Sequence, residues 1–130
     1  MIILTVRTDK PEAEIGLYEN ETQLAYHSWQ AHRELAETIH TKINEICAGQ
    51  SKALPDIEGI IFFQGPGSFT GLRIGASVCN ALAYGFGIPI IASNGDDWRE
   101  SGIARLLAGE RNTTALPEYG APAFTTVQKK

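Results

Sequence analysis

The chain has 130 residues, 43% of them hydrophobic and 20% charged, a size and composition that indicate one compact domain with its own core. Eleven Lys and Arg against fifteen Asp and Glu give a formal charge of −4, so the chain as a whole does not attract nucleic acid. Cys47 and Cys79 both lie in apolar helical patterns, which argues for buried thiols in the cytoplasm rather than a disulfide. No run approaches the roughly 18 apolar residues of a membrane span, so no membrane contact is expected.

The first half of the sequence predicts three strands and a helix. Runs rich in β-branched residues at 2–6, 13–18 and 23–28 predict strands in meander order. Between 31 and 47 the apolar residues recur at steps of three and four, which predicts an amphipathic helix that Gly49 ends.

The second half predicts two further strands, each followed by a helix. The run 57–63 is almost wholly apolar, which indicates a central strand covered on both faces. A helix capped by Ser68 or Thr70 then runs to about residue 86. A short strand at 89–92 and a helix from Asp96 or Asp97 to about residue 107 complete the pattern.

The order βββαβαβα predicts an α/β fold, a mixed five-stranded sheet with flanking helices. We expect a single domain at 1–109 and an extended tail at 110–130, where Asn, Thr, Pro and Gly are frequent. A strand meander followed by βαβ units is typical of the ribonuclease H-like, actin-like ATPase superfamily.

The densest motif is a glycine-rich turn between the central strand and the following helix. It consists of Gly65, Pro66, Gly67, Ser68, Phe69, Thr70 and Gly71. Such a turn can hold a phosphate with backbone N–H groups at a helix N-terminus. It lacks the Lys-Ser/Thr of a Walker loop, and Thr70 stands where a dinucleotide fingerprint has its last glycine. Two interpretations stay open: an anion site, or a tight turn that lets backbones approach closely.

The helix after this turn has two apolar stripes instead of one. The first is Leu72, Ala76, Cys79, Ala83 and Phe86, and the second is Ile74, Val78, Ala81 and Gly85. One stripe is enough for packing on a sheet, so the second is covered either by a partner or by the helix at 31–47. The candidate partner contacts on these two helices are Leu35, Ile39, Arg73, Ser77, Asn80, Ala81 and Tyr84.

No catalytic, metal or cofactor site is predicted. His32 and His40 are eight positions apart on one helix, about 12 Å of rise, which is too far for one metal ion. Ser68 lacks the spacing of a G-x-S-x-G nucleophile, and no His follows it in the sequence.

The segment 65–75 resembles the characteristic segment of the TsaB family, the non-catalytic, TsaD-like (Gcp-like) subunit of the bacterial tRNA threonylcarbamoyladenosine machinery. The similarity extends to Gly87-Ile88-Pro89-Ile90 and, more loosely, back to His32-Arg33-Glu34, which is similar to the family's His-Ser-Glu. The resemblance implies an actin-like domain whose two long helices pair with TsaD or with a second TsaB. It implies only indirect contact with tRNA, and it leaves open whether a TsaE-like ATPase joins as a further partner.

The sequence departs from the family in two places. Members usually have a second domain after the last helix, so a shortened form is expected, and the ending 117–122 is similar to the family's C-terminal Pro, Tyr and Pro. Arg7, followed by Thr8, stands where actin-like members have Asp, and a guanidinium cannot hold a metal ion near a phosphate. Two other functions stay open: a small actin-like ATPase using the Gly65 to Gly71 turn, or a homodimeric scaffold.

Overall fold

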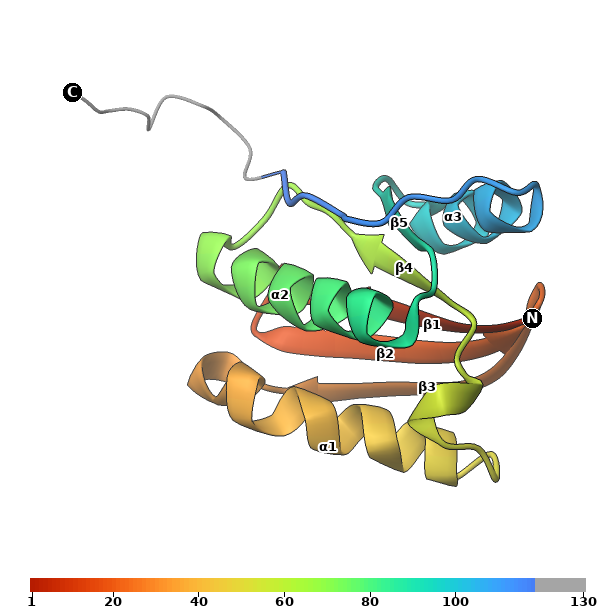
Figure 1. The fold of residues 1–130 in the computed structure, drawn as a ribbon. Helices are drawn as coiled ribbons and strands as arrows, with labels where there is room; N and C mark the ends of the chain where they lie inside the picture. The colour runs from red at the N-terminus through yellow and green to blue at the C-terminus, as the bar shows by residue number, and fades with distance from the viewer. Residues whose placement is uncertain (119–130) are drawn as a thin grey trace.

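A computed structural model describes residues 1–118 and contains a five-stranded mixed sheet in the order β3-β2-β1-β4-β5 (Figure 1). The strands β1 (Ile2–Arg7), β2 (Glu12–Glu19) and β3 (Thr22–Gln30) form an antiparallel meander. The strands β4 (Gly59–Phe63) and β5 (Ile90–Ser93) run parallel to β1. The described strands therefore leave β3 at one edge and β5 at the other.

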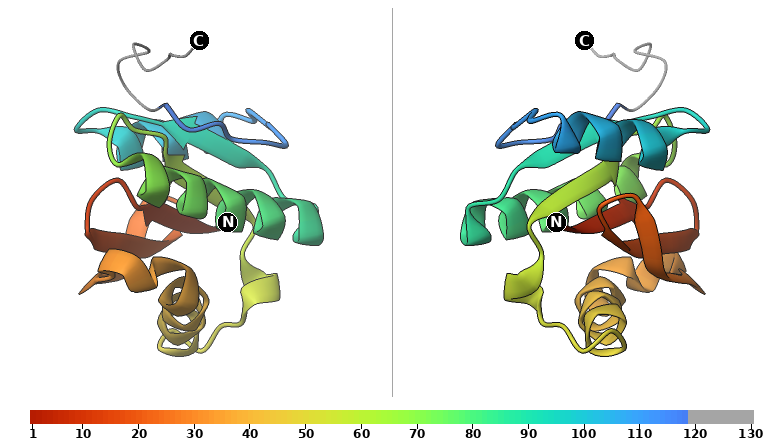
Figure 2. Two further views of the ribbon diagram at one scale, coloured as in Figure 1. Left: turned by 90° about the vertical axis from the view of Figure 1, so that its left-hand side faces the viewer. Right: turned by 90° about the vertical axis from the view of Figure 1, so that its right-hand side faces the viewer.

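Three helices cover the two faces of the sheet unequally. The helices α1 (Leu35–Ala48) and α2 (Phe69–Phe86) lie side by side on one face and run in the same direction (Figure 1). The helix α3 (Trp98–Leu107) packs on the other face against β4 and β5, at the opposite end of the molecule from α1 (Figure 2). None of the helices within residues 1–118 has the length and hydrophobicity of a membrane span.

The expected strands and helices are all present in the predicted order. Helix α1 begins later than predicted, because His32–Glu34 forms a separate 3₁₀ turn. Strand β4 begins at Gly59 instead of residue 57, and another 3₁₀ turn, Leu54–Asp56, precedes it. Gly49 follows the last residue of α1, which confirms the predicted end of this helix. One predicted detail is wrong: Asp97 holds the position before α3 but makes no side-chain capping hydrogen bond.

The core has a layer on each side of the sheet. The layer under α1 and α2 includes Leu4, Leu17, Ile39, Ile60, Phe62 and Leu72, all 0% exposed. The layer under α3 includes Ile61, Ile91 and Trp98, whose ring packs edge-on against Phe63 at a centroid distance of 5.6 Å. All five residues of β4 are buried, which confirms the prediction of a strand covered on both faces. The middle position of the sheet, however, belongs to β1, and β4 lies between β1 and the edge strand β5.

Helix α2 approaches the end of β1 unusually closely. A Cβ added at Gly75 would lie 2.1 Å from Thr8 Oγ1, and one added at Gly71 would lie 2.1 Å from the Thr8 carbonyl oxygen. The Thr8 hydroxyl uses this closeness to donate a hydrogen bond to the Gly71 carbonyl, at 2.7 Å. The two glycines therefore allow a helix-to-strand contact that any side chain would block.

The segment 110–118 lies along the outer edge of β5 and across the end of β4. The Ile90 N–H donates to the Asn112 carbonyl at 3.0 Å, and the Glu118 N–H donates to the Gln64 carbonyl at 2.6 Å. Ala115 is 2% exposed and belongs to the core layer under α2. Of the expected tail, residues 119–130 lie outside the part of the chain that the structure describes, and so does most of the Pro, Tyr and Pro ending.

Candidate functional site

The glycine-rich turn packs against the chain's own backbone. A Cβ at Gly65, whose φ is +114°, would lie 2.2 Å from the Glu118 carbonyl oxygen, and one at Gly67 would lie 2.4 Å from Asp9 Cβ. The Ser68 N–H donates to the Asp9 carbonyl at 2.9 Å, while Ser68 Oγ accepts from the Gly71 N–H at 3.4 Å as the cap of α2. These contacts favour the interpretation of a tight turn over that of a phosphate site.

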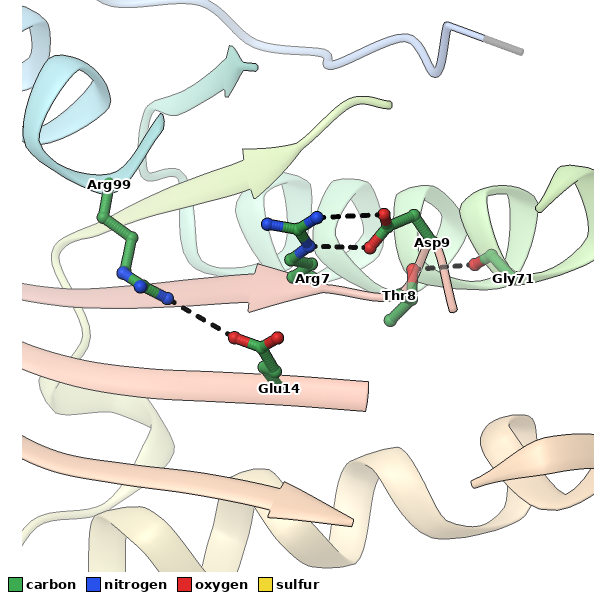
Figure 3. A network of polar contacts seen from close by, with 6 residues as sticks. All are labelled: Arg7, Thr8, Asp9, Glu14, Gly71 and Arg99. Atoms are coloured by element: carbon green, nitrogen blue, oxygen red, sulfur yellow. Dashed lines mark hydrogen bonds and ion pairs between the residues drawn. The ribbon is translucent and has the colours of Figure 1, made fainter. Parts of the chain in front are cut away.

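An ion pair occupies the end of β1 beside this turn (Figure 3). Arg7 Nε and Nη2 donate to the two carboxylate oxygens of Asp9, at 2.8 and 3.2 Å, and the guanidinium lies 4.0 Å from the centre of the Phe63 ring. The Asp9 side chain is only 6% exposed. The Asp9 carboxylate is thus paired with Arg7 and is not free to hold a cation beside a phosphate.

The titratable side chains of residues 1–118 include no group of three His, Cys, Asp or Glu that lies close enough together to hold a metal ion. Burial raises the pKa of both the Cys47 and the Cys79 thiols, so neither has the character of a nucleophile.

The two apolar stripes of α2 have different surroundings. In the first, Leu72, Ala76, Cys79 and Ala83 are buried against the sheet, and Phe86 is 40% exposed at the end. In the second, Val78 is 9% exposed and Ile74 is half-buried beside α1, whereas Ala81 and Gly85 are exposed. The second stripe is therefore covered by α1 only along its N-terminal half.

The predicted partner contacts fall into three groups. Leu35 and Ile39 are 4% and 0% exposed, because α1 has a single apolar stripe and uses it on the sheet, so neither can reach a partner without opening the core. Asn80 is hydrogen-bonded to the backbone of Ala115. The remaining four, which are exposed on α2, are Arg73, Ser77, Ala81 and Tyr84.

We define the α1/α2 face as the exposed α2 residues Arg73, Ser77, Ala81, Tyr84 and Gly85 together with Ala36 and His40 on the adjoining side of α1. Arg73, Ser77, Ala81 and Gly85 follow one another at steps of four along α2, so they lie in one row. Tyr84, which is 90% exposed, stands beside this row. Between the helices lies a cavity of about 430 Å³, lined by Ala36, His40, Thr70, Arg73, Ile74, Ser77 and Val78. The α1/α2 face thus combines a row of mostly small residues, a groove and two side-chain types common at interface hot spots, Arg73 in the row and Tyr84 beside it.

Two features of the structure around α2 were not predicted from the sequence. Lys10 and Arg33 line a second cavity of about 580 Å³ at the N-terminal ends of α1 and α2. The contacts of residues 112–118 were also missed, since their composition is that of a tail; the apolar pair Ala115-Leu116 between polar residues was the available signal.

The chain is similar to proteins of tRNA threonylcarbamoyladenosine biosynthesis. A family model described as "TsaD: tRNA N6-adenosine threonylcarbamoyltransferase" matches residues 27–95. The TsaB protein of Escherichia coli is 32% identical over 119 residues, 83% of this chain and 49% of that protein. The TsaB protein of Haemophilus influenzae is 40% identical over 74 residues, 52% of this chain and 31% of that protein. A threonylcarbamoyltransferase of Chromobacterium violaceum is 34% identical over 107 residues, 70% of this chain and 31% of that protein.

Solved structures agree with this relationship. YeaZ from Pseudomonas aeruginosa superposes with a TM-score of 0.67 at 25% identity, over 78% of this chain and 50% of that one. RuvC from Thermus thermophilus, with a TM-score of 0.52 at 11% identity over 92% of this chain and 86% of that one, shows the shared fold alone.

These similarities confirm the predicted ribonuclease H-like, actin-like fold. This chain spans about half or less of the length of the curated relatives it matches. The matched residues 27–95 include the glycine-rich turn and all of α1 and α2, the elements that form the α1/α2 face. The chain therefore belongs to the TsaD family and, within it, to the TsaB proteins.

Proposed function

We propose that this protein is a non-catalytic subunit that binds a TsaD-like enzyme through its α1/α2 face and so supports threonylcarbamoylation of adenosine in tRNA. The names of its TsaB and TsaD relatives supply the process. The observation that carries the binding role is the row Arg73, Ser77, Ala81 and Gly85, which no segment of residues 1–118 covers. In this role the protein acts in the cytoplasm, and tRNA contacts the enzyme rather than this subunit.

The physical argument rests on how closely another helix can approach. Small side chains at Ser77, Ala81 and Gly85 let a second backbone come near α2, which increases packing contacts along the whole row. Gly85 costs up to about 1 kcal/mol in a helix relative to Ala, and nothing within the described chain lies within 4 Å of its missing Cβ. Close packing of a partner helix would account for a glycine at position 85, whereas no contact within the described chain does.

The same geometry gives little support to the rival ATPase function. The turn glycines are packed against Asp9 and Glu118, and the end of β1 carries an arginine–aspartate pair in place of a free carboxylate. A homodimer through the α1/α2 face is the other alternative, and it is an outcome of the experiment below.

The test compares two alanines that are both exposed on helices but lie on opposite sides of the sheet. Ala81→Arg places a long charged side chain in the row on α2, whereas Ala104→Arg places it on α3. Binding of each variant to the TsaD-like protein of the same organism is measured by calorimetry, and the oligomeric state of the wild-type chain alone by light scattering. We expect Ala81→Arg to weaken binding at least tenfold and Ala104→Arg to leave it within about twofold.

Two results would count against the proposal. One is equal binding by both variants, which would move the contact away from α2. The other is a wild-type chain that forms a stable homodimer, lost in Ala81→Arg, and does not bind the TsaD-like protein.

A further inference from the structure

Two adjoining cavities lie along α1 and α2, and Thr70 and Ile74 line both of them. The larger, about 580 Å³, lies at the N-terminal ends of the helices, and the smaller, about 430 Å³, lies between them; together they are called the groove below. The groove starts at the N-terminal ends of the two helices, at the left of Figure 1, and runs between them toward Ser77. The combined size of the two cavities suits an extended or helical segment better than a small ion.

The charge along this groove is opposite to that of the chain. Three of the side chains that line the groove are Lys or Arg: Lys10, Arg33 and Arg73. Glu34 is the only Asp or Glu among the lining residues of the two cavities. The whole chain carries four more acidic than basic residues. None of these three cations takes part in an ion pair within residues 1–118, so their charge is available to a partner.

The walls of the groove are partly apolar. Ile74 is half-buried and Val78 is 9% exposed, and both line the groove together with Ala36. Arg73 adds a flat surface, because its guanidinium lies 5.4 Å from the centre of the Phe69 ring. Cationic groups around an apolar floor match a segment that carries both carboxylates and apolar side chains.

We propose that the groove holds an acidic, partly apolar segment of the TsaD-like partner, with its carboxylates directed to Lys10, Arg33 and Arg73. The inference rests on the proposed function and specifies the chemistry of the partner's contact. RNA is the poorer occupant, because three cations and an apolar floor provide few of the roughly 6–10 phosphate contacts that hold a nucleic acid. A second copy is also disfavoured, since a two-fold pairing of grooves brings like charges together.

The decisive comparison reverses one charge inside the groove and one outside it. Arg33→Glu changes the groove, whereas Lys52→Glu makes the same change of charge beyond the C-terminal end of α1. Binding of the full chain to the TsaD-like protein is measured at low and at high salt. We expect Arg33→Glu to weaken binding about tenfold and to reduce its salt dependence, and Lys52→Glu to stay within about twofold of the wild type.

A rescue experiment identifies the chemistry of the partner. Single Asp→Lys and Glu→Lys changes in the partner are screened for one that restores the binding of Arg33→Glu and weakens that of the wild type. Recovery of this kind supports the inference. If no partner change restores binding, the groove does not receive a carboxylate segment.

Failure of the inference can be told apart from failure of the proposed function. Suppose that Ala81→Arg weakens binding while Arg33→Glu and Lys52→Glu bind equally well. The α1/α2 face is then the binding surface, as proposed, but the groove does not hold an acidic segment. If the wild type does not bind the TsaD-like protein at all, both fail. If Arg33→Glu instead abolishes binding of tRNA by the chain alone and leaves the protein complex unchanged, the groove is an RNA site and the inference is overturned.

Discussion

Asn80 of α2 and Ala115 of the C-terminal segment exchange two hydrogen bonds. The Ala115 N–H donates to Asn80 Oδ1 at 2.8 Å, and Asn80 Nδ2 donates to the Ala115 carbonyl at 2.9 Å. Both bonds are partly buried, so water competes poorly for these groups. The pair joins the segment 110–118 to the helix that carries the α1/α2 face, on the side of α2 turned away from α1.

Replacing Asn80 by Ala should loosen this segment. The Ala115 amide and carbonyl lose their partners while Ala115 stays buried, which should lower the free energy of unfolding by about 1–3 kcal/mol. Urea denaturation measures the loss, and hydrogen exchange at the amides of Ala115 and Glu118 should become faster. The control is Asn44→Ala on the exposed side of α1, expected to change stability by at most about 0.5 kcal/mol. Equal stability of the two variants would show that the two hydrogen bonds between Asn80 and Ala115 do not contribute to the free energy of unfolding.

Two glycines within α2 should respond oppositely to substitution by alanine. At Gly75 the new Cβ would lie 2.1 Å from Thr8 Oγ1 and 3.0 Å from the Phe62 ring, and Thr8 is 0% exposed, so it cannot move aside freely. Gly75→Ala should therefore destabilise the protein by about 1–3 kcal/mol. At Gly85 the Cβ meets nothing within 4 Å, so Gly85→Ala should stabilise it by up to about 1 kcal/mol.

Thermal unfolding of the two glycine variants measures the difference directly. Gly75 lies in the interior of α2 and Gly85 in its last turn, so helix propensity alone would favour Ala at least as much at Gly75 as at Gly85. A stabilising Gly75→Ala would mean that α2 does not lie as close to Thr8 as the structure places it.

The order of the elements was predictable because hydrophobic periodicity specifies it. The steps of three and four in α1 and the apolar run of β4 are local patterns, and each produced the element expected. The bounds were less predictable, since the 3₁₀ turns at His32–Glu34 and Leu54–Asp56 depend on how the chain enters the core. The two-striped helix was recognised, but how much of its second stripe α1 covers depends on helix-to-helix spacing, which periodicity does not contain.

The site was less predictable than the fold because its contacts join distant parts of the chain. The pattern that predicts Leu35 and Ile39 as partner contacts is the same one that buries them, since an apolar stripe does not specify which surface it covers. The Arg7–Asp9 pair could have been anticipated from side chains two apart at a strand end, which point to the same side. The meeting of Lys10 and Arg33 in one cavity could not, because it requires the turn after β1 to lie beside the start of α1.

The two arginine–carboxylate pairs drawn in Figure 3 should differ in their importance to stability. The Arg7–Asp9 pair is bidentate and its carboxylate is 6% exposed, so Arg7→Leu leaves a buried charge without a partner and should cost about 2–4 kcal/mol. The Arg99–Glu14 pair has one contact of 3.4 Å between side chains 30% and 18% exposed. Arg99→Leu should therefore cost at most about 1 kcal/mol.

The test of this ranking includes a compensating change. Asp9→Asn removes the negative charge, so Arg7→Leu with Asp9→Asn should be more stable in urea than Arg7→Leu alone. If Asp9→Asn instead lowers the free energy of unfolding further, the destabilisation by Arg7→Leu comes from lost packing of the arginine side chain on Phe63 and not from an unpaired Asp9 carboxylate.

The two thiols should be unreactive in the folded protein and reactive in urea. Cys79 is 0% exposed and Cys47 is 1% exposed, and burial raises the pKa of each, with Asp56 adding to the effect at Cys47. At about pH 8 an unfolded thiol is partly ionised, whereas the folded ones stay protonated and covered. A thiol reagent followed by absorbance should therefore label neither Cys within the time in which it labels both in urea. Rapid labelling of native Cys79 would contradict the packing of α2 against the sheet.

The same shifts predict how stability depends on pH in the alkaline range. A thiol whose pKa is raised by folding contributes stability that is fully present below the unfolded pKa of about 8.5 and decreases as the pH rises above it, because the unfolded chain then binds fewer protons. The free energy of unfolding in urea should thus fall between about pH 8 and 10. Burial also raises the pKa of Tyr18 and Tyr26, but their contribution begins only near pH 10, the ordinary value of a tyrosine. Cys79→Ala should flatten the slope below that pH, and an unchanged slope would mean that the folded thiol ionises as readily as the unfolded one.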